Sequence, residues 1–163
     1  MKLALSLGRR GQGQCWPNPS VGCVIVRDGR IVGRGWTQPG GRPHAESVAL
    51  DRAGAAARGA TAYVTLEPCA HHGETPPCAP ALAEAGIARV GAAIEAVDAR
   101  VSGKGFALLR KAGVAVTTGV LSGMAEADMA GFLRRVRGGR PDLTLKLASS
   151  FDGRIATASG RSR

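Results

Sequence analysis

The chain has 163 residues, a formal net charge of +10, and a composition that is 44% hydrophobic and 21% charged. A chain of this length can bury the core of one compact domain without disulfides. No apolar run approaches the roughly 18 residues that cross a bilayer, so no membrane span is expected. The basic residues are spread along the chain and only 4% of residues are aromatic. A nucleic-acid partner, which needs aromatic side chains for base stacking, is therefore not expected.

The apolar stretch at residues 1–7 is interpreted as an amphipathic helix. It looks briefly like the start of a signal peptide, but Gly8-Arg9-Arg10-Gly11 ends it early and no cleavage site of small residues follows. Four cysteines without a secretion signal are typical of a reducing compartment, where they bind metal or pack in the core. We therefore expect a cytoplasmic protein.

The elements that follow alternate along the chain. Asp28-Gly29 lies between two runs of strand-forming residues and predicts a hairpin turn. Apolar patterns and chain breakers predict strands at 21–26, 30–36, 61–66, 89–94 and 114–118, and helices at 44–57, 78–86, 106–112 and 123–137. Strands that alternate with helices predict an α/β fold, with helices on both faces of one sheet.

The pattern changes after the last of these helices. Residues 138–141 (GGRP) have the composition of a linker, and residues 143–148 predict a new strand. We therefore divide the chain into a domain at 1–138 and a segment at 139–163, which we expect to hold a linker and the first strand of an incomplete second unit.

Four residues carry the expected chemistry: His44, Glu46, Cys69 and Cys78, with eight residues between the two cysteines. One imidazole and two thiolates can hold Zn²⁺ and leave the fourth tetrahedral position to water, which is the arrangement of zinc deaminases. Predicted helix starts at 44 and 78 support this set, because helix N-termini favour thiolate over thiol. We predict that His44, Cys69 and Cys78 bind one catalytic zinc ion.

Glu46 is predicted to be the catalytic acid and base. It follows His44 by two residues, so both can border one cavity in the first turn of a helix, although they do not share a face. Zinc lowers the pKa of a bound water to about 7. Glu46 would take the proton of that water, pass it to a ring nitrogen and later protonate the leaving amine. The expected reaction is hydrolytic removal of an amino group from a heteroaromatic ring.

Other interpretations stay open at this point. A structural zinc site would close with a fourth protein ligand, and His71 and His72 are near enough in sequence to supply it. Such a chain would be a zinc-stabilised binding module. The two cysteines could also be small buried hydrophobic residues without a metal.

Three longer motifs make the resemblance specific. They are PNPSVGCVIV at 17–26, PHAE at 43–46 and TLEPCAHHGETPPC at 65–78. The chain resembles the deaminase domain of the bifunctional riboflavin-biosynthesis deaminase/reductase, a family with the cytidine deaminase-like fold. Other deaminases of this superfamily typically have only two residues between the cysteines. The segment KLASSFDGRIA at 146–156 resembles the first strand and turn of that family's NADPH-dependent reductase domain.

The resemblance implies a three-layer α/β/α fold with a central mixed sheet of about five strands. It implies deamination of 2,5-diamino-6-(5-phosphoribosylamino)pyrimidin-4(3H)-one to 5-amino-6-(5-phosphoribosylamino)uracil, with Zn²⁺ as the cofactor. NADPH would be a cofactor only if the missing reductase domain were present. Substrate contacts are expected from Asn18, His71 and Lys104, while a turn-forming Asn18 and a merely exposed Lys104 remain the alternatives. A homo-oligomer is also expected.

The chain departs from the family pattern at three places. Thr37 stands where many members have His, Glu74 where Lys or Arg is common, and Ala96–Ala99 where Asp-Pro-Asn-Pro is usual. An anion beside a phosphorylated substrate would replace attraction by repulsion, so the phosphate contact would be weaker, altered, or supplied by other residues such as Arg100. These departures also leave open a diverged zinc deaminase that acts on another nucleobase or nucleoside.

Overall fold

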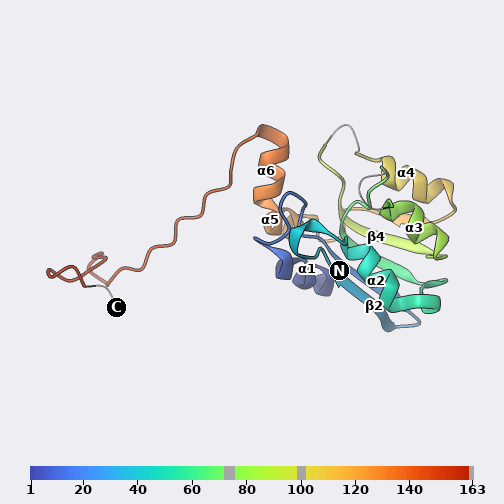
Figure 1. Cartoon of the computed structure of the whole chain (residues 1–163), viewed down its shortest axis with the longest axis horizontal. Coiled ribbons are helices and arrows are strands. Elements are labelled where there is room, and N and C mark those ends of the chain that lie inside the picture. The colour runs from blue at the N-terminus through green and yellow to red at the C-terminus, as the bar shows by residue number, and fades with distance from the viewer. Residues whose placement is uncertain (72–75, 99–101, 162–163) are drawn as a thin grey trace.

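Five strands form one mixed sheet in the order β2-β1-β3-β4-β5. β1 pairs antiparallel with both β2 and β3, whereas β3, β4 and β5 run parallel. The computed structural model describes residues 1–71, 76–98 and 102–161 (Figure 1). The strands are β1 (Gly22–Arg27), β2 (Arg30–Trp36), β3 (Thr61–Leu66), β4 (Arg89–Ile94) and β5 (Ala115–Thr117).

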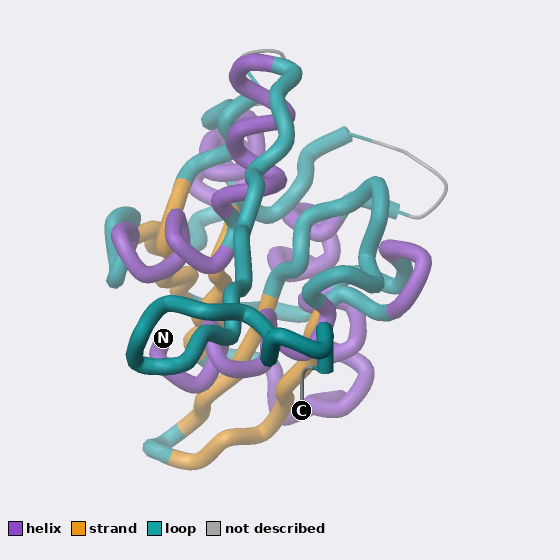
Figure 2. Tube along the Cα trace, turned by 90° about the vertical axis from the view of Figure 1, so that its left-hand side faces the viewer, coloured by secondary structure: helices purple, strands orange, loops and turns teal. Residues whose placement is uncertain are grey.

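Helices cover both faces of this sheet, as Figures 1 and 2 show. α2 packs on β1 and β2 and contacts α3, which in turn contacts α4; α1 and α5 contact one another and lie against β1 and β4 respectively. The three-layer α/β/α arrangement is therefore confirmed. The helices are α1 (Lys2–Gly8), α2 (Ala45–Ala53), α3 (Cys78–Glu84), α4 (Lys104–Lys111), α5 (Ser122–Asp128) and α6 (Ala130–Gly138), with 3₁₀ turns η1 (Arg9–Gly11), η2 (Pro39–Gly41) and η3 (Gly54–Ala57).

The β1–β2 hairpin turns where the sequence predicts. Asp28 and Gly29 both adopt positive φ angles, 50° and 74°, as both central residues of a type I′ turn require. The short turn is visible at the lower edge of Figure 2. Cys23, in β1, is fully buried, so this cysteine belongs to the core.

Two glycines of β2 let α2 approach the sheet closely. A Cβ on Gly33 would lie 2.2 Å from the carbonyl oxygen of Ala49, and one on Gly35 would lie 2.4 Å from that of Ala45. Real Cβ atoms do not come this near to backbone, so only glycine fits here. This close contact fixes the position of α2, whose first turn carries Glu46.

The predicted closing helix is two helices. Met129 has φ −110° and ψ 16° and separates α5 from α6. The end of α5 is held by the N-terminal segment, because the side chain of Asp128 pairs with Arg9 at 2.9 Å and its carbonyl oxygen accepts a hydrogen bond from Gln12. These contacts between distant parts of the chain override the continuous helical pattern.

The strand predicted at 143–148 is not formed. These residues are exposed and have no regular secondary structure, and Figure 1 shows the chain running away from the domain after α6. A strand needs a neighbouring strand to satisfy its backbone donors and acceptors, and this segment has none within the described part of the chain. The last helix of the domain ends at Gly138.

None of the helices in the ranges given above is long and apolar enough to span a membrane.

Candidate functional site

Three side chains from separate parts of the chain meet at one end of α2. His44 immediately precedes α2, Cys69 follows β3, and Cys78 is the first residue of α3. Their ligand atoms all lie within 4.8 Å of one another. Nδ1 of His44 is 3.7 Å from Sγ of Cys69 and 3.5 Å from Sγ of Cys78. The chain thus brings together the three residues that the sequence predicts as metal ligands.

The first turn of α3 fixes one of these sulfurs. The backbone amide of Cys78 donates to Sγ of Cys69 at 3.3 Å, and the amide of Ala79 donates to the carbonyl oxygen of Cys69 at 3.0 Å. The unpaired amides at this helix start therefore serve as donors to Cys69, one to its sulfur and one to its carbonyl oxygen. Pro77 precedes the helix in an extended conformation, and no side chain of the described residues makes a capping hydrogen bond there.

The two cysteines differ in acidity when no metal is bound. The pKa of Cys69 is lowered to about 4, first because the Cys78 thiol donates a hydrogen bond to it and then because His44 does, against the effect of burial. The pKa of Cys78 is raised because its proton is shared with Cys69 and because it is buried. The hydrogen bond to Cys69 also raises the pKa of His44.

This donor set fits Zn²⁺. Two sulfurs and one imidazole nitrogen are the ligands that zinc takes in tetrahedral sites, and the metal would replace the shared proton. His44, Cys69 and Cys78 would hold the ion. His71 is not in the cluster, and His72 lies outside the described residues, so within those residues the set contains three ligands.

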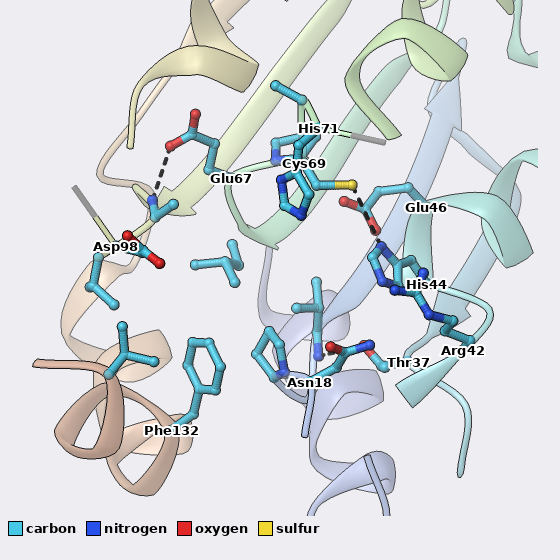
Figure 3. A pocket seen from close by; sticks show the side chains of 18 of the residues that line it. Asn18, Thr37, Arg42, His44, Glu46, Glu67, Cys69, His71, Asp98 and Phe132 are labelled. Carbon is cyan, nitrogen blue, oxygen red and sulfur yellow. Dashed lines mark hydrogen bonds between the residues drawn. The ribbon is translucent and has the colours of Figure 1, made fainter. Parts of the chain in front are cut away.

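Glu46 is buried beside the sulfurs. It is only 4% exposed, and Figure 3 shows its carboxylate next to Cys69 and His44. Burial raises the pKa of Glu46 to about 7, the negative charge on Cys69 adds to this rise, and His44 opposes it. A bound dication would also oppose it. A carboxyl group in this range can both take and give a proton near neutral pH.

The site opens into a cavity of about 890 Å³. His44, Glu46 and Cys69 border it on one side, and Phe132 of α6 lies on another (Figure 3). The volume is in the range of pockets that enclose a small organic ligand. Cationic side chains are also part of its lining: Arg42, Arg135 and Arg137.

The predicted substrate contacts have different positions. Asn18 lines the cavity, and its side-chain Nδ2 donates to the carbonyl oxygen of Gly41 at 2.8 Å. His71 also lines the cavity and is exposed. Lys104 is exposed at the first position of α4 and lies outside the lining. Two of the three therefore share the cavity with Glu46.

Of the three departures from the family pattern, Thr37 can be placed fully. It is buried at 2% exposure and lines the cavity. Its Oγ1 accepts a hydrogen bond from the Val21 amide at 3.0 Å, and its own amide donates to the Val21 carbonyl oxygen, so Thr37 ties β2's end to the segment before β1. Glu74, Ala99 and Arg100 lie outside the described residues.

Arg135 and Glu67 are among the lining residues that were not predicted. Arg135 donates to the carbonyl oxygen of Pro17 at 2.9 Å and stacks on the Trp16 ring at 4.6 Å. In the sequence it stands among Arg134, Arg137 and Arg140 near a predicted helix end, and only the fold brings it to the cavity. Glu67 stands in the TLEPC stretch, but its partners are far away in the sequence.

Comparison with known proteins identifies the protein family. A sequence profile described as the cytidine and deoxycytidylate deaminase zinc-binding region matches residues 1–94, which is more than half of the chain and includes all three candidate metal ligands. The chain belongs to this family of zinc-dependent deaminases.

Similarity along most of the chain identifies the group of deaminases to which it belongs within this family. The chain is 47% identical over 141 residues to the diaminohydroxyphosphoribosylamino-pyrimidine deaminase of Buchnera aphidicola subsp. Acyrthosiphon pisum, covering 86% of this chain and 96% of that protein. Within the class it therefore belongs to the riboflavin-biosynthesis deaminases. It is also 54% identical over 163 residues to the riboflavin biosynthesis protein RibD of Haemophilus influenzae, of which it spans 44%.

A solved structure agrees with this assignment. The crystal structure of a diaminohydroxyphosphoribosylaminopyrimidine deaminase/5-amino-6-(5-phosphoribosylamino)uracil reductase from Thermotoga maritima matches with a TM-score of 0.91 and 42% identity, over 100% of this chain and 47% of that one. The chain thus spans less than half the length of the RibD protein of Haemophilus influenzae and of the Thermotoga maritima deaminase/reductase.

Proposed function

We propose that this chain deaminates 2,5-diamino-6-(5-phosphoribosylamino)pyrimidin-4(3H)-one hydrolytically to 5-amino-6-(5-phosphoribosylamino)uracil. The observation that carries the proposal is a buried carboxylate, Glu46, beside a His-Cys-Cys cluster at the base of a large cavity. A relative that matches 86% of the chain is named for this activity. Zinc is the cofactor to which the three ligands are suited.

Bound at His44, Cys69 and Cys78, zinc would supply a water molecule of pKa about 7 as the nucleophile. The rest of the chemistry falls to Glu46. Its carboxylate takes one proton of the attacking water and gives it to the ring nitrogen next to the carbon under attack. It then takes the second proton from the hydroxyl now on that carbon and gives it to the amino group, which leaves as ammonia while the ring C=O bond forms. Because Glu46 is buried, bulk water does not compete for these protons.

The cavity has groups that suit the rest of this substrate. One amide hydrogen of Asn18 is donated to the carbonyl oxygen of Gly41. Its carboxamide oxygen and second amide hydrogen can form hydrogen bonds with the edge of a pyrimidine. We assign His71 to the same ring. Arg135, held by Pro17 and Trp16, would meet the phosphate, since Arg binds phosphate through its planar donors. Lys104, outside the lining, is not needed for these contacts.

The proposal predicts release of one ammonia per substrate by zinc-loaded protein. The assay would follow ammonia and the product mass, with zinc quantified in the same sample. A parallel assay with the dephosphorylated substrate should show a KM at least about tenfold higher, as the loss of one charge-assisted contact implies.

Glu46→Gln is the matched control, because it keeps the shape of the side chain but cannot accept the proton. It should retain zinc and lose at least about a hundredfold in kcat, the typical share of general acid–base catalysis. Turnover of unphosphorylated nucleosides in preference to the phosphorylated compound would instead support a diverged deaminase. Loss of zinc from the variant would make Glu46 a ligand.

The family resemblance also leads us to propose a homo-oligomer in the cytoplasm. Light scattering of the purified chain and cell fractionation would test these two points.

A further inference from the structure

Glu67 is a buried carboxylate that follows β3 and borders the cavity. It is 6% exposed, and its two oxygens accept four backbone hydrogen bonds. Oε2 accepts from the amides of Ala96 at 2.9 Å and Gly103 at 3.0 Å. Oε1 accepts from the amides of Gly105 at 2.8 Å and Phe106 at 3.3 Å. Burial of such a group is tolerated only where hydrogen bonds replace water.

These four amides belong to neighbouring parts of the chain. Those of Ala96 and Gly103 lie toward the two ends of the connection between β4 and α4, and those of Gly105 and Phe106 lie in the first turn of α4. Residues 96–98 line the cavity, and Figure 3 shows Glu67 next to this wall, with the dashed bond to the Ala96 amide. Glu67 therefore joins a cavity wall to a helix start.

The end of β4 and the start of α4 also contact the backbone that leads from β3 to Cys69. The amide of Glu67 donates to the carbonyl oxygen of Ile94 at 2.9 Å. A Cβ on Gly105 would lie 1.9 Å from the carbonyl oxygen of Pro68, so α4 begins directly against the backbone between Glu67 and Cys69. The wall, the helix and the ligand-bearing loop thus meet at one carboxylate.

We propose that Glu67 is a positioning residue for the deamination, which holds the 96–98 wall of the cavity against the segment that carries Cys69. It does not move protons, because both of its oxygens are occupied by backbone donors. Loss of these bonds releases one wall of the cavity, and so weakens substrate binding more than the chemical step. Only this kinetic consequence rests on the proposed function.

The test uses the isosteric variant Glu67→Gln in the zinc-loaded protein. The amide group replaces one acceptor oxygen with a donor, which then faces two of the four backbone N–H groups. Hydrogen exchange of those amides should become at least about tenfold faster, because they lose their acceptor. KM should rise about tenfold with kcat changed less than about threefold, and zinc content should stay at the wild-type value.

Glu95→Gln is the matched control. Glu95 is an exposed carboxylate next to the same segment and accepts a hydrogen bond from the Ser102 hydroxyl at 2.6 Å. Replacing this carboxylate with an amide should leave KM, kcat and hydrogen exchange of the four amides unchanged. Glu67→Asp keeps the charge with a shorter reach, and should show the same changes to a smaller degree, which provides a second test if the Gln variant does not fold.

Two results would overturn the proposal. One is unchanged exchange of all four amides in a folded Glu67 variant. The other is a fall in kcat as large as that of Glu46→Gln with KM unchanged, which would make Glu67 a chemical participant. Exchange requires no substrate, so this result stays interpretable even if the protein acts on a different compound.

Discussion

Glu46 and the sulfur of Cys69 lie close enough to determine one another's charge. Burial and the nearby thiolate raise the pKa of Glu46 to about 7, whereas hydrogen bonds lower that of Cys69 to about 4. Near neutral pH the metal-free site thus carries negative charge on sulfur, and its carboxyl group lies close to its pKa. Both features suit a site that binds a dication and then moves protons.

The raised pKa of Glu46 predicts a pH-dependent stability difference in metal-free protein. The pKa rises from 4.5 to about 7 on folding, so the native state binds more protons between these values. The stability that this contributes is fully present below about pH 4.5 and is lost as pH rises to about 7. Glu46→Gln is neutral at every pH. Wild type and variant should therefore unfold at similar temperatures near pH 4, and the variant should be the more stable one at pH 8.

Thermal unfolding in the presence of a chelator would measure this difference. Glu126→Gln, at an exposed position of α5, is the control and should show no such divergence. A constant difference between wild type and Glu46→Gln from pH 4 to pH 8 would contradict a buried carboxyl group with a raised pKa.

Which site residues could be predicted depends on how local their pattern is. His44, Cys69 and Cys78 stand in short motifs whose spacing is typical of a zinc site, and the fold brings them within 4.8 Å. The roles of Glu67 and Arg135 could not be predicted, because their partners are backbone groups of segments 29 to 39 and 118 residues away. Neither a hydrophobic periodicity nor a short sequence motif indicates such contacts.

At the scale of elements, the position of α2 depends on two glycines of the strand beneath it. Gly35→Ala would place a Cβ 2.4 Å from the carbonyl oxygen of Ala45. Because backbone cannot move aside cheaply, we expect a loss of about 1–3 kcal/mol in the free energy of unfolding. Urea denaturation would measure it, and zinc affinity should fall as well, since His44 and Glu46 are carried by the displaced helix.

Gly123→Ala is the matched control for this change. Gly123 lies in the first turn of α5, and a Cβ there would meet nothing within 4 Å. This variant should be as stable as wild type or slightly more stable, because alanine is the better helix former. Equal effects of the two substitutions would mean that the close approach of α2 does not depend on Gly35.

Strand boundaries followed from the sequence more reliably than helix boundaries. Arg30–Trp36, Thr61–Leu66 and Arg89–Ile94 form strands as predicted, because each is a buried or half-buried run between turn residues. The break at Met129 was missed, since it results from contacts of Asp128 with Arg9 and Gln12. The strand expected at 143–148 is not formed in the described chain, where it has no partner strand.

At the scale of the whole molecule, the chain after α6 contributes little to the domain. Residues 143–161 are exposed except for the half-buried Ala156, and their side-chain hydrogen bonds are internal, as between Ser150 and Arg154. Asp142 still pairs with Arg134 at 3.1 Å. A chain that ends at Asp142 should therefore keep its zinc content and turnover, and its Tm within about 2 °C, since a change of 1 kcal/mol would shift Tm by more.

Differential scanning calorimetry and the ammonia assay would compare the two chains. A fall of several degrees or loss of activity would show that residues 143–163 belong to the deaminase unit, against the division into 1–138 and 139–163.

The most direct measurement is zinc K-edge X-ray absorption on the zinc-loaded chain. We predict two sulfur neighbours near 2.3 Å and two lighter neighbours near 2.0–2.1 Å, one of them an oxygen that is not from the protein. Cys78→Ser should reduce the sulfur shell to one. A zinc ion with four protein ligands, or with sulfur neighbours unaffected by loss of Cys78, would contradict an open catalytic site at His44, Cys69 and Cys78.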